Sequence, residues 1–252
     1  MKSVSFNQKT FIKLGLGFAA AFILISAASL LGHFSEDKIL KNTEIIEFNI
    51  SEVNHLDAVL AHPYSKILDK IANITLILAH TVLVLFVFVL PGAYTVPRAL
   101  KNFQAQKEEL KFLIYDFIVY LQSVMVTTGL YKLLKVAVGR ARPYLYFPES
   151  VLTGIETKDF FRSWPSGHST LAFIAAGFFI SWILTRNTEK KTKIFGTSLI
   201  LLFASATAVL RVFSGNHFFT DVISGAVIGT FCPALVYFIH QKAVEHIKPE
   251  GF

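Results

Sequence analysis

Six long apolar segments constrain the fold of this chain more than any other feature. A helix needs about 20 mostly apolar residues to cross the hydrocarbon core of a bilayer. Five of the segments contain no charged residue, and the third carries only Asp116, close to its start. The segments are 14–31, 71–96, 112–131, 169–185, 194–210 and 222–239. The pattern predicts an all-α polytopic membrane protein, with one six-helix bundle domain over residues 1–252.

The composition supports a membrane protein over a soluble one. Hydrophobic residues make up 53% of the chain and charged residues only 16%, whereas about a quarter of a soluble domain is charged. The two shortest segments could be buried helices of a soluble protein, but six apolar blocks in one chain argue against that. The single cysteine, Cys232, excludes an internal disulfide. The net charge of +7 is better explained by basic residues that flank spans than by a nucleic-acid partner.

The first apolar segment could be a signal peptide or a retained anchor. Lys2, Lys9 and Lys13 precede it, and Ala27-Ala28 lies near its end, as in a cleaved signal. The segment stays apolar through Leu31, which is longer than the usual core of a signal peptide. We therefore expect it to be retained.

The distribution of basic residues predicts the orientation. With six spans, both termini and the second and fourth loops lie on one side of the membrane, and this side carries 13 of the 24 Lys and Arg in fewer residues than the other side has. The positive-inside rule makes that side cytoplasmic. Three polar patches in the second half of the chain then lie on the opposite face, the periplasm or cell exterior.

The first patch combines Lys135 with Arg142 and Pro143. Lys135 and Arg142 are seven residues apart, close to two helical turns, so a helix that continued through both would place them on one face. Pro143 would end or redirect that helix. Arginine can grip phosphate oxygens with two N–H groups, whereas lysine acts as a point charge. Alone, the pair could also be ordinary basic residues at a membrane interface.

The second patch, Pro165-Ser166-Gly167-His168, directly precedes the fourth apolar segment. Ser166 is a favoured N-cap, and the first N–H groups of a helix have no partner within it. Such a helix start binds anions readily, and Gly167 lets the backbone come close. His168 is expected in the first turn, facing the anion. A plain helix cap beside a solvated histidine is the alternative.

The third patch contains Arg211, His217 and Asp221. His217 and Asp221 are four residues apart, so they would share one face of a helix. A carboxylate that accepts a hydrogen bond from one ring nitrogen fixes the tautomer and leaves the other nitrogen as a nucleophile. Arg211 could reach the same phosphate. By itself, this cluster could also be a solvated loop.

Taken together, the patches resemble a known family. Each lies at the end of an apolar segment on the same predicted side of the membrane, which independent accidents would not produce. Their order and spacing, K-x6-R-P, P-S-G-H and R-x5-H-x3-D, resemble the motifs of the type 2 phosphatidic acid phosphatase (PAP2) superfamily, in its integral-membrane lipid phosphatase branch. The serine that opens the third motif in the family is Leu210 here, which removes one hydrogen bond.

The resemblance implies a role for each motif residue. His217 would attack phosphorus and form a phosphohistidine, with Asp221 orienting its ring. His168 would protonate the leaving oxygen and then activate the water that hydrolyses the intermediate. The phosphate would be held by Lys135, Arg142, Ser166, Gly167 and Arg211.

Other polar residues are expected to play lesser parts. No cluster of acidic residues suits a divalent metal, so we expect metal-independent chemistry and no cofactor. Arg140 and Arg162 could add charge for an anionic substrate, although a solvated loop is the favoured interpretation for each. Asp116 is expected to be a structural contact within its helix, and Gly225-(three residues)-Gly229 a helix-packing patch.

These observations favour a lipid phosphatase that acts on a terminal phosphomonoester or diphosphate while the lipid tail stays in the bilayer. Phosphatidate, phosphatidylglycerol phosphate, undecaprenyl diphosphate and a lipid A phosphate all present such a group. A lipid phosphotransferase that uses the same histidine and a non-catalytic lipid transporter are the alternatives. The expected location is the bacterial cytoplasmic (inner) membrane, with the site facing the periplasm or the exterior. The sequence makes no prediction of the oligomeric state.

Overall fold

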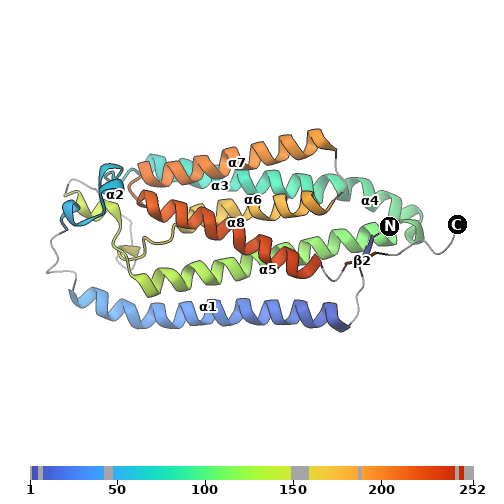
Figure 1. The fold of residues 1–252 in the computed structure, drawn as a ribbon, viewed down its shortest axis with the longest axis horizontal. Coiled ribbons are helices and arrows are strands. Elements are labelled where there is room, and N and C mark those ends of the chain that lie inside the picture. The colour runs from blue at the N-terminus through green and yellow to red at the C-terminus, as the bar shows by residue number, and fades with distance from the viewer. Residues whose placement is uncertain are drawn as a thin grey trace.

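The computed structural model describes residues 2–4, 8–42, 48–148, 159–186, 189–241 and 244–246, and nearly all of them are helical (Figure 1). Six helices, or continuous helical runs, are long and apolar enough to cross a membrane. They are α1 (Gln8–Asn42), α3 with η2 and α4 (Lys66–Val84, Leu85–Val89 and Leu90–Lys101), α5 (Phe103–Val138), α6 (Gly167–Thr185), α7 (Lys190–Phe213) and α8 (Phe219–Gln241). Each apolar segment of the sequence lies inside one of these runs. The all-α six-helix bundle is confirmed, and the chain is a multi-pass membrane protein.

Short elements occupy the two ends of the bundle. One end holds the 3-10 turns η1 (Ile50–Glu52) and η3 (Pro143–Tyr146) and the short helix α2 (His55–Val59). The opposite end holds both chain termini, where the three-residue strands β1 (Lys2–Val4) and β2 (Val244–His246) pair antiparallel (Figure 1). Helix α5 ends, α6 and α8 begin and α7 ends at the α2 end, so the topology gathers the three motifs there.

The helix boundaries follow from local chemistry. Asn102 accepts a hydrogen bond from the Ala105 N–H at 3.2 Å and so caps the start of α5. Ser65 likewise accepts from the Leu68 N–H at the start of α3. Helix α5 stops at Gly139, whose φ of 60° is the left-handed conformation that ends many helices.

Helix α6 is the most buried of the six and packs most extensively on α8. A Cβ at Gly229 would collide with the Thr170 carbonyl, and one at Gly225 would come within 2.6 Å of the Ser166 carbonyl. The two glycines therefore let α8 lie close against α6, as the sequence predicted. In a bilayer, such close packing replaces the hydrophobic drive that joins helices in water.

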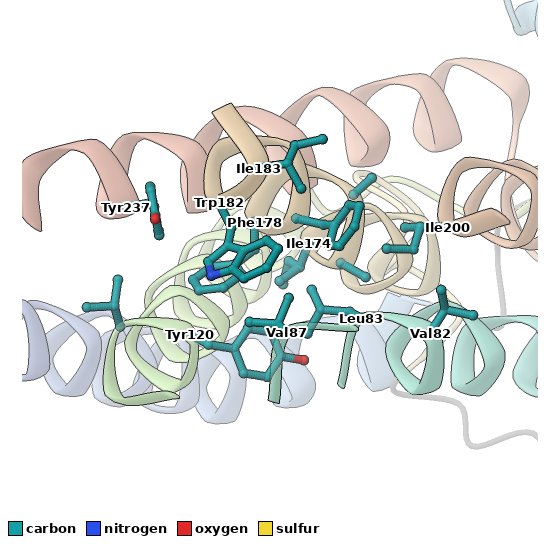
Figure 2. Close-up of a cluster of buried hydrophobic side chains, with 14 of the residues drawn as sticks. Val82, Leu83, Val87, Tyr120, Ile174, Phe178, Trp182, Ile183, Ile200 and Tyr237 are labelled. Carbon is teal, nitrogen blue, oxygen red and sulfur yellow. The ribbon is translucent and has the colours of Figure 1, made fainter. Parts of the chain in front are cut away.

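The buried core lies between α6 and the helices around it. Its side chains come from α1, α3, η2, α5, α6, α7 and α8, and the labelled ones in Figure 2 include Leu83, Tyr120, Phe178, Ile200 and Tyr237. Large apolar side chains such as Phe22, Leu202 and Phe231 point outward and are more than 60% exposed. An apolar outer surface on all-helical spans is what a bilayer requires.

Candidate active site

The first motif spans the end of α5 and the turn that follows. Lys135 lies on the last turn of the helix, and its Nζ donates to the carbonyls of Arg162 at 2.5 Å and Ser163 at 3.3 Å. The helix ends before Arg142, because Gly139 is left-handed, so α5 does not continue through both residues and the two do not share a helical face. Arg142 nevertheless turns inward, and its Nε donates to the Asp159 carbonyl at 2.8 Å.

The second motif forms the start of α6. Ser166 is the N-cap, as predicted, and accepts from the Ser169 N–H at 3.4 Å. Gly167 begins the helix, where a Cβ would come within 3.0 Å of the Tyr131 ring. His168 lies in the first turn, and its Nε2 is 2.7 Å from Oδ1 of Asn73 on α3. Because a carboxamide oxygen only accepts, this contact suits a proton on Nε2 of His168.

The third motif bridges the end of α7 and the start of α8. Arg211, on the last turn of α7, donates to Asp69 of α3. His217 lies in the turn between the helices and Asp221 in the first turn of α8, so the expected shared helical face does not occur. Gly215 has φ 71°, and a Cβ there would press on the His62 carbonyl, which explains the glycine in this tight turn.

His217 and Asp221 approach each other without forming a hydrogen bond. Nδ1 of His217 is 3.6 Å from Oδ2 of Asp221 and has no hydrogen-bond partner among the described residues. The Asp221 carboxylate is fully buried and accepts instead from Ser163 Oγ at 2.5 Å, from the Phe218 N–H at 2.9 Å and from Arg140 Nη1 at 2.6 Å. These three donors satisfy the carboxylate and hold it beside the imidazole.

The other ring nitrogen of His217 has the character of a nucleophile. Arg142 Nη1 lies 3.4 Å from Nε2, and since arginine can only donate, Nε2 accepts in this contact. The proton of the neutral ring is then on Nδ1, which faces Asp221. Burial, and next the positive charges of Lys135, Arg142 and Arg211, hold the pKa of the His217 imidazole well below its usual range. The ring is therefore neutral at physiological pH, with a lone pair on Nε2.

Five of the eight predicted site residues line one cavity of about 540 Å³. They are Lys135, Arg142, Gly167, His168 and His217. The other three stand behind the cavity wall: Ser166 and Asp221 are fully buried, and Arg211 is only 3% exposed. A cavity with cationic walls, a helix N-terminus and two imidazoles can hold an anion and exchange protons with it.

Several polar residues of the site were not predicted from the sequence. Asp69 and Asn73, one turn apart on α3, contact Arg211 and His168, respectively. Arg140, expected in a solvated loop, instead bonds to Asp221 and to Asp57 of α2, with its side chain 23% exposed. These residues belong to no local motif. The only sequence signal for Asp69 and Asn73 is that each is a polar residue at the start of an apolar segment, whereas Arg140 lies within the spacer of the first motif.

No group of three or more His, Cys, Asp or Glu within the described residues could hold a metal ion. The cavity is lined by one carboxylate, Asp159, and by four basic side chains in addition to the two histidines. Divalent cations prefer oxygen ligands and negative charge, so this donor set fits an anion.

Comparison with known proteins agrees with the arrangement. A PA-phosphatase related-family protein of Dictyostelium discoideum is 33% identical over 132 residues, which cover 49% of this chain and 48% of the relative. Lipid phosphate phosphatase 1 of Arabidopsis thaliana is 30% identical over 135 residues, which cover 46% of this chain and 41% of the relative. The chain thus spans about half the length of the curated relatives that it matches.

A solved structure is also similar. The crystal structure of Aquifex aeolicus LpxE aligns with a TM-score of 0.42 and 22% identity, over 79% of this chain and 98% of that one. The sequence profile of the PAP2 superfamily matches residues 116–245, slightly more than half of the chain, and these residues include all three motifs. The chain therefore belongs to the PAP2 superfamily.

Proposed function

We propose that this protein is a metal-independent lipid phosphatase that removes a terminal phosphate through a phosphohistidine on His217. The observation that carries the proposal is the state of His217: a neutral imidazole whose Nε2 lone pair faces a cation-lined cavity. That group can attack phosphorus without first losing a proton. The surrounding cations would stabilise the negative charge on the phosphate oxygens in the transition state.

The proposed reaction has two steps. In the first, Nε2 of His217 bonds to phosphorus while the bond from phosphorus to the leaving oxygen breaks, and His168 gives that oxygen a proton. The imidazole then carries positive charge, which Asp221 stabilises across the short gap to Nδ1. In the second step, water attacks phosphorus, His168 takes a proton from the water, and the nitrogen–phosphorus bond breaks to release phosphate.

The phosphate ligands divide into two groups by position. Lys135, Arg142 and the N-terminal turn of α6 at Gly167 line the cavity and would contact the phosphate directly. Arg211 lies behind this wall, paired with Asp69, and its Nε has no partner among the described residues. It would contribute its positive charge, and a small rearrangement would allow a direct bond. Ser166 would act by capping α6 and orienting its first N–H groups.

A lipid substrate fits the position of the cavity. Besides the polar groups, its walls include Ala28 and Gly32 of α1 and Tyr131 and Val136 of α5. The cavity therefore adjoins the seam between α1 and α5, whose outer surfaces are apolar. A phosphate could enter the site here while an acyl or prenyl chain remained in the bilayer.

We further propose that the site faces the periplasm or cell exterior. The α2 end of the bundle holds the motifs, while Arg98, Lys101, Lys190 and Lys191 lie at the opposite end, which would be cytoplasmic. In a Cys232→Ser background, Glu52→Cys should react with an impermeant thiol reagent added outside intact cells, and Gln104→Cys only after the membrane is opened. The reverse labelling would place the site in the cytoplasm.

Phosphate release by the purified protein in detergent tests the activity. Phosphatidate, phosphatidylglycerol phosphate, undecaprenyl diphosphate and a lipid A phosphate should be compared, with and without EDTA, beside His217→Ala. At least one lipid should release phosphate, unaffected by EDTA and abolished in the variant. Loss of activity in chelator that Mg²⁺ restores would contradict the metal-independent scheme. Transfer of the phosphate to an added alcohol in preference to water would identify a phosphotransferase.

A further inference from the structure

Arg140 lies between Lys135 and Arg142, the two basic residues of the first motif, and makes an unusual set of contacts. Its Nη1 donates to Oδ1 of Asp221 at 2.6 Å, and its Nη2 donates to Oδ2 of Asp57 at 2.7 Å. The guanidinium also lies over the Phe218 ring, with its carbon 4.2 Å from the ring centre. One cation is thus shared between two buried carboxylates and packed against a residue next to His217.

Asp57 ties this arrangement to the first loop and to the start of α8. It is fully buried, and its Oδ1 accepts from the Thr220 N–H at 2.9 Å, while its Oδ2 accepts from Thr220 Oγ1 at 2.6 Å. The first N–H groups of a helix have no partner within it, so Asp57 caps α8 from a distant part of the chain. Burial alone would raise the pKa of Asp57, but the hydrogen bonds from Arg140, Thr220 and Asn54 outweigh it and lower the pKa, so the group is ionised.

We infer that Arg140 and Asp57 are positioning residues for the nucleophile, which act on His217 through Asp221. Arg140 holds Oδ1 of Asp221, so the other oxygen, Oδ2, stays turned toward Nδ1 of His217 at 3.6 Å. Asp57 in turn holds Arg140 and the helix turn that carries Asp221. This inference rests on the proposed role of His217. It makes α2, which carries Asp57, part of the structure that orients this histidine.

A direct bond from Arg140 to the phosphate is the main competing role. Arg140 is not among the residues that line the cavity, and both of its terminal nitrogens are already bonded to carboxylates. Arg142, in contrast, lines the cavity and contacts Nε2 of His217. The two roles predict different kinetics, because a positioning residue affects the chemical step and a phosphate ligand also affects binding.

The kinetic test measures kcat, KM and inhibition by inorganic phosphate for Arg140→Gln, Asp57→Asn and Arg142→Gln. We expect Arg140→Gln and Asp57→Asn to lower kcat about 10- to 100-fold, as is typical when a group that orients an active-site residue is removed. KM and phosphate inhibition should change less than about threefold in these two variants and much more in Arg142→Gln. Arg140→Lys should recover part of kcat, since lysine keeps the charge but cannot bridge both carboxylates.

A double-variant cycle shows whether Arg140 acts through Asp221. In an Asp221→Asn background, Arg140→Gln should lower kcat by less than about threefold further, because the group through which it acts has already been altered. An equal loss of kcat in both backgrounds, or a rise in KM like that of Arg142→Gln, would overturn the inference. Wild-type protein without phosphatase activity on any lipid would instead contradict the proposed function.

A readout without turnover tests the inference independently of that function. In protein labelled with ¹⁵N-histidine, the Nδ1 resonance of His217, assigned from its loss in His217→Ala, should shift in Arg140→Gln. The matched control is Arg186→Gln, which removes another arginine that is paired with a buried aspartate and stacked over a phenylalanine, at the other end of the bundle. An unchanged resonance in folded Arg140→Gln, or an equal shift in the control, would overturn the inference.

Discussion

Each end of the bundle carries an arginine that is paired with a buried aspartate and stacked over a phenylalanine. At the motif end, Arg140 donates to Asp221 at 2.6 Å and lies over Phe218. At the opposite end, Arg186 donates to Asp116, also at 2.6 Å. The arginine side chains are similarly exposed, 23% and 21%. The same combination of an arginine, a buried aspartate and a phenylalanine therefore occurs at both ends of the bundle, in different surroundings.

The two arginine clusters differ in the hydrogen bonding of the buried polar groups beside them. At the opposite end, Asp116 also accepts from Trp182 Nε1 at 2.9 Å, and the guanidinium of Arg186 lies over Phe112, so the cluster joins helices α5 and α6. At the motif end, Nδ1 of His217 and Nε of Arg211 are buried and have no partner among the described residues. A buried polar atom without a partner is costly; here His217 lines the cationic cavity and Arg211 lies behind its wall. In the proposed scheme, the contrast separates a structural cluster from one that binds phosphate and reacts with it.

The largest expected effect is on kcat: loss of the proposed nucleophile at the motif end should lower it far more than loss of Arg186 at the opposite end. His217→Ala removes the atom that is proposed to bond to phosphorus and should lower kcat by about 10⁴-fold or more. Arg186→Gln should keep kcat within about threefold of the wild type, because it acts on stability alone. Phosphate release by both purified variants, matched for folded protein, checks the contrast. Near-wild-type turnover by His217→Ala would remove the motif end from the reaction.

The proposed role of His168 as the general acid can be tested with substrates whose leaving groups differ in their need for a proton. His168→Ala should lower kcat about 10²- to 10⁴-fold for a lipid phosphate, whose alkoxide leaving group needs a proton. The p-nitrophenolate of p-nitrophenyl phosphate leaves without that proton, so its release in a single turnover should be affected much less. The measurement is the fold-loss of rate in His168→Ala for the lipid phosphate, divided by the fold-loss for p-nitrophenyl phosphate. Equal losses for both substrates would show that His168 does not act as the acid.

The pH dependence of activity tests whether the positive charges at the motif end lower the pKa of His217. His217 must be neutral to attack, and burial together with Lys135 and Arg142 lowers its pKa. Activity should therefore persist through about pH 6.5, where an unperturbed histidine is half protonated, and be lost only at lower pH. Arg142→Gln removes a nearby positive charge, so the acid limb of kcat/KM should move to higher pH. A shift to lower pH, or no shift, would contradict the role of these charges.

The smallest effect on catalysis, with a clear effect on stability, is expected at the opposite end. Arg186→Gln leaves the Asp116 carboxylate without its positive partner, and breaking a fully buried pair in this way costs about 3–5 kcal/mol. The cost should fall below that range here, because Arg186 is 21% exposed. Thermal unfolding in detergent should show a lower midpoint while kcat per folded protein is retained. A large loss of kcat would show that the two ends are coupled.

Much of the fold could be predicted from the sequence, because bilayer spans are set by local composition. The apolar segments gave the six helices, Ser166 predicted the cap of α6, and Gly225 and Gly229 predicted a close helix contact. The spacing arguments were weaker where the chain leaves the helix. Gly139 ends α5 before Arg142, and His217 precedes α8, so helical periodicity did not apply to either pair.

The supporting residues of the site could not be predicted in the same way. Asp57, Asp69 and Asn73 come from the first half of the chain, and their partners lie in the second half. Such pairings depend on how helices pack, which no local period encodes. The contacts of Arg140, for which the sequence favours a solvated loop over added charge for the substrate, are unpredictable for the same reason: its two carboxylate partners are distant in the sequence.

The nature of the covalent intermediate provides the sharpest experiment. His168→Ala should still form a phosphoenzyme from a substrate with a good leaving group but should hydrolyse it slowly, because no base activates the water. Rapid quenching in alkali, which preserves phosphohistidine, followed by mass spectrometry would locate the phosphate. We predict phosphate on His217, and none in the double variant His168→Ala/His217→Ala. Phosphate on any other residue, or rapid turnover without a phosphoenzyme, would contradict the proposed mechanism.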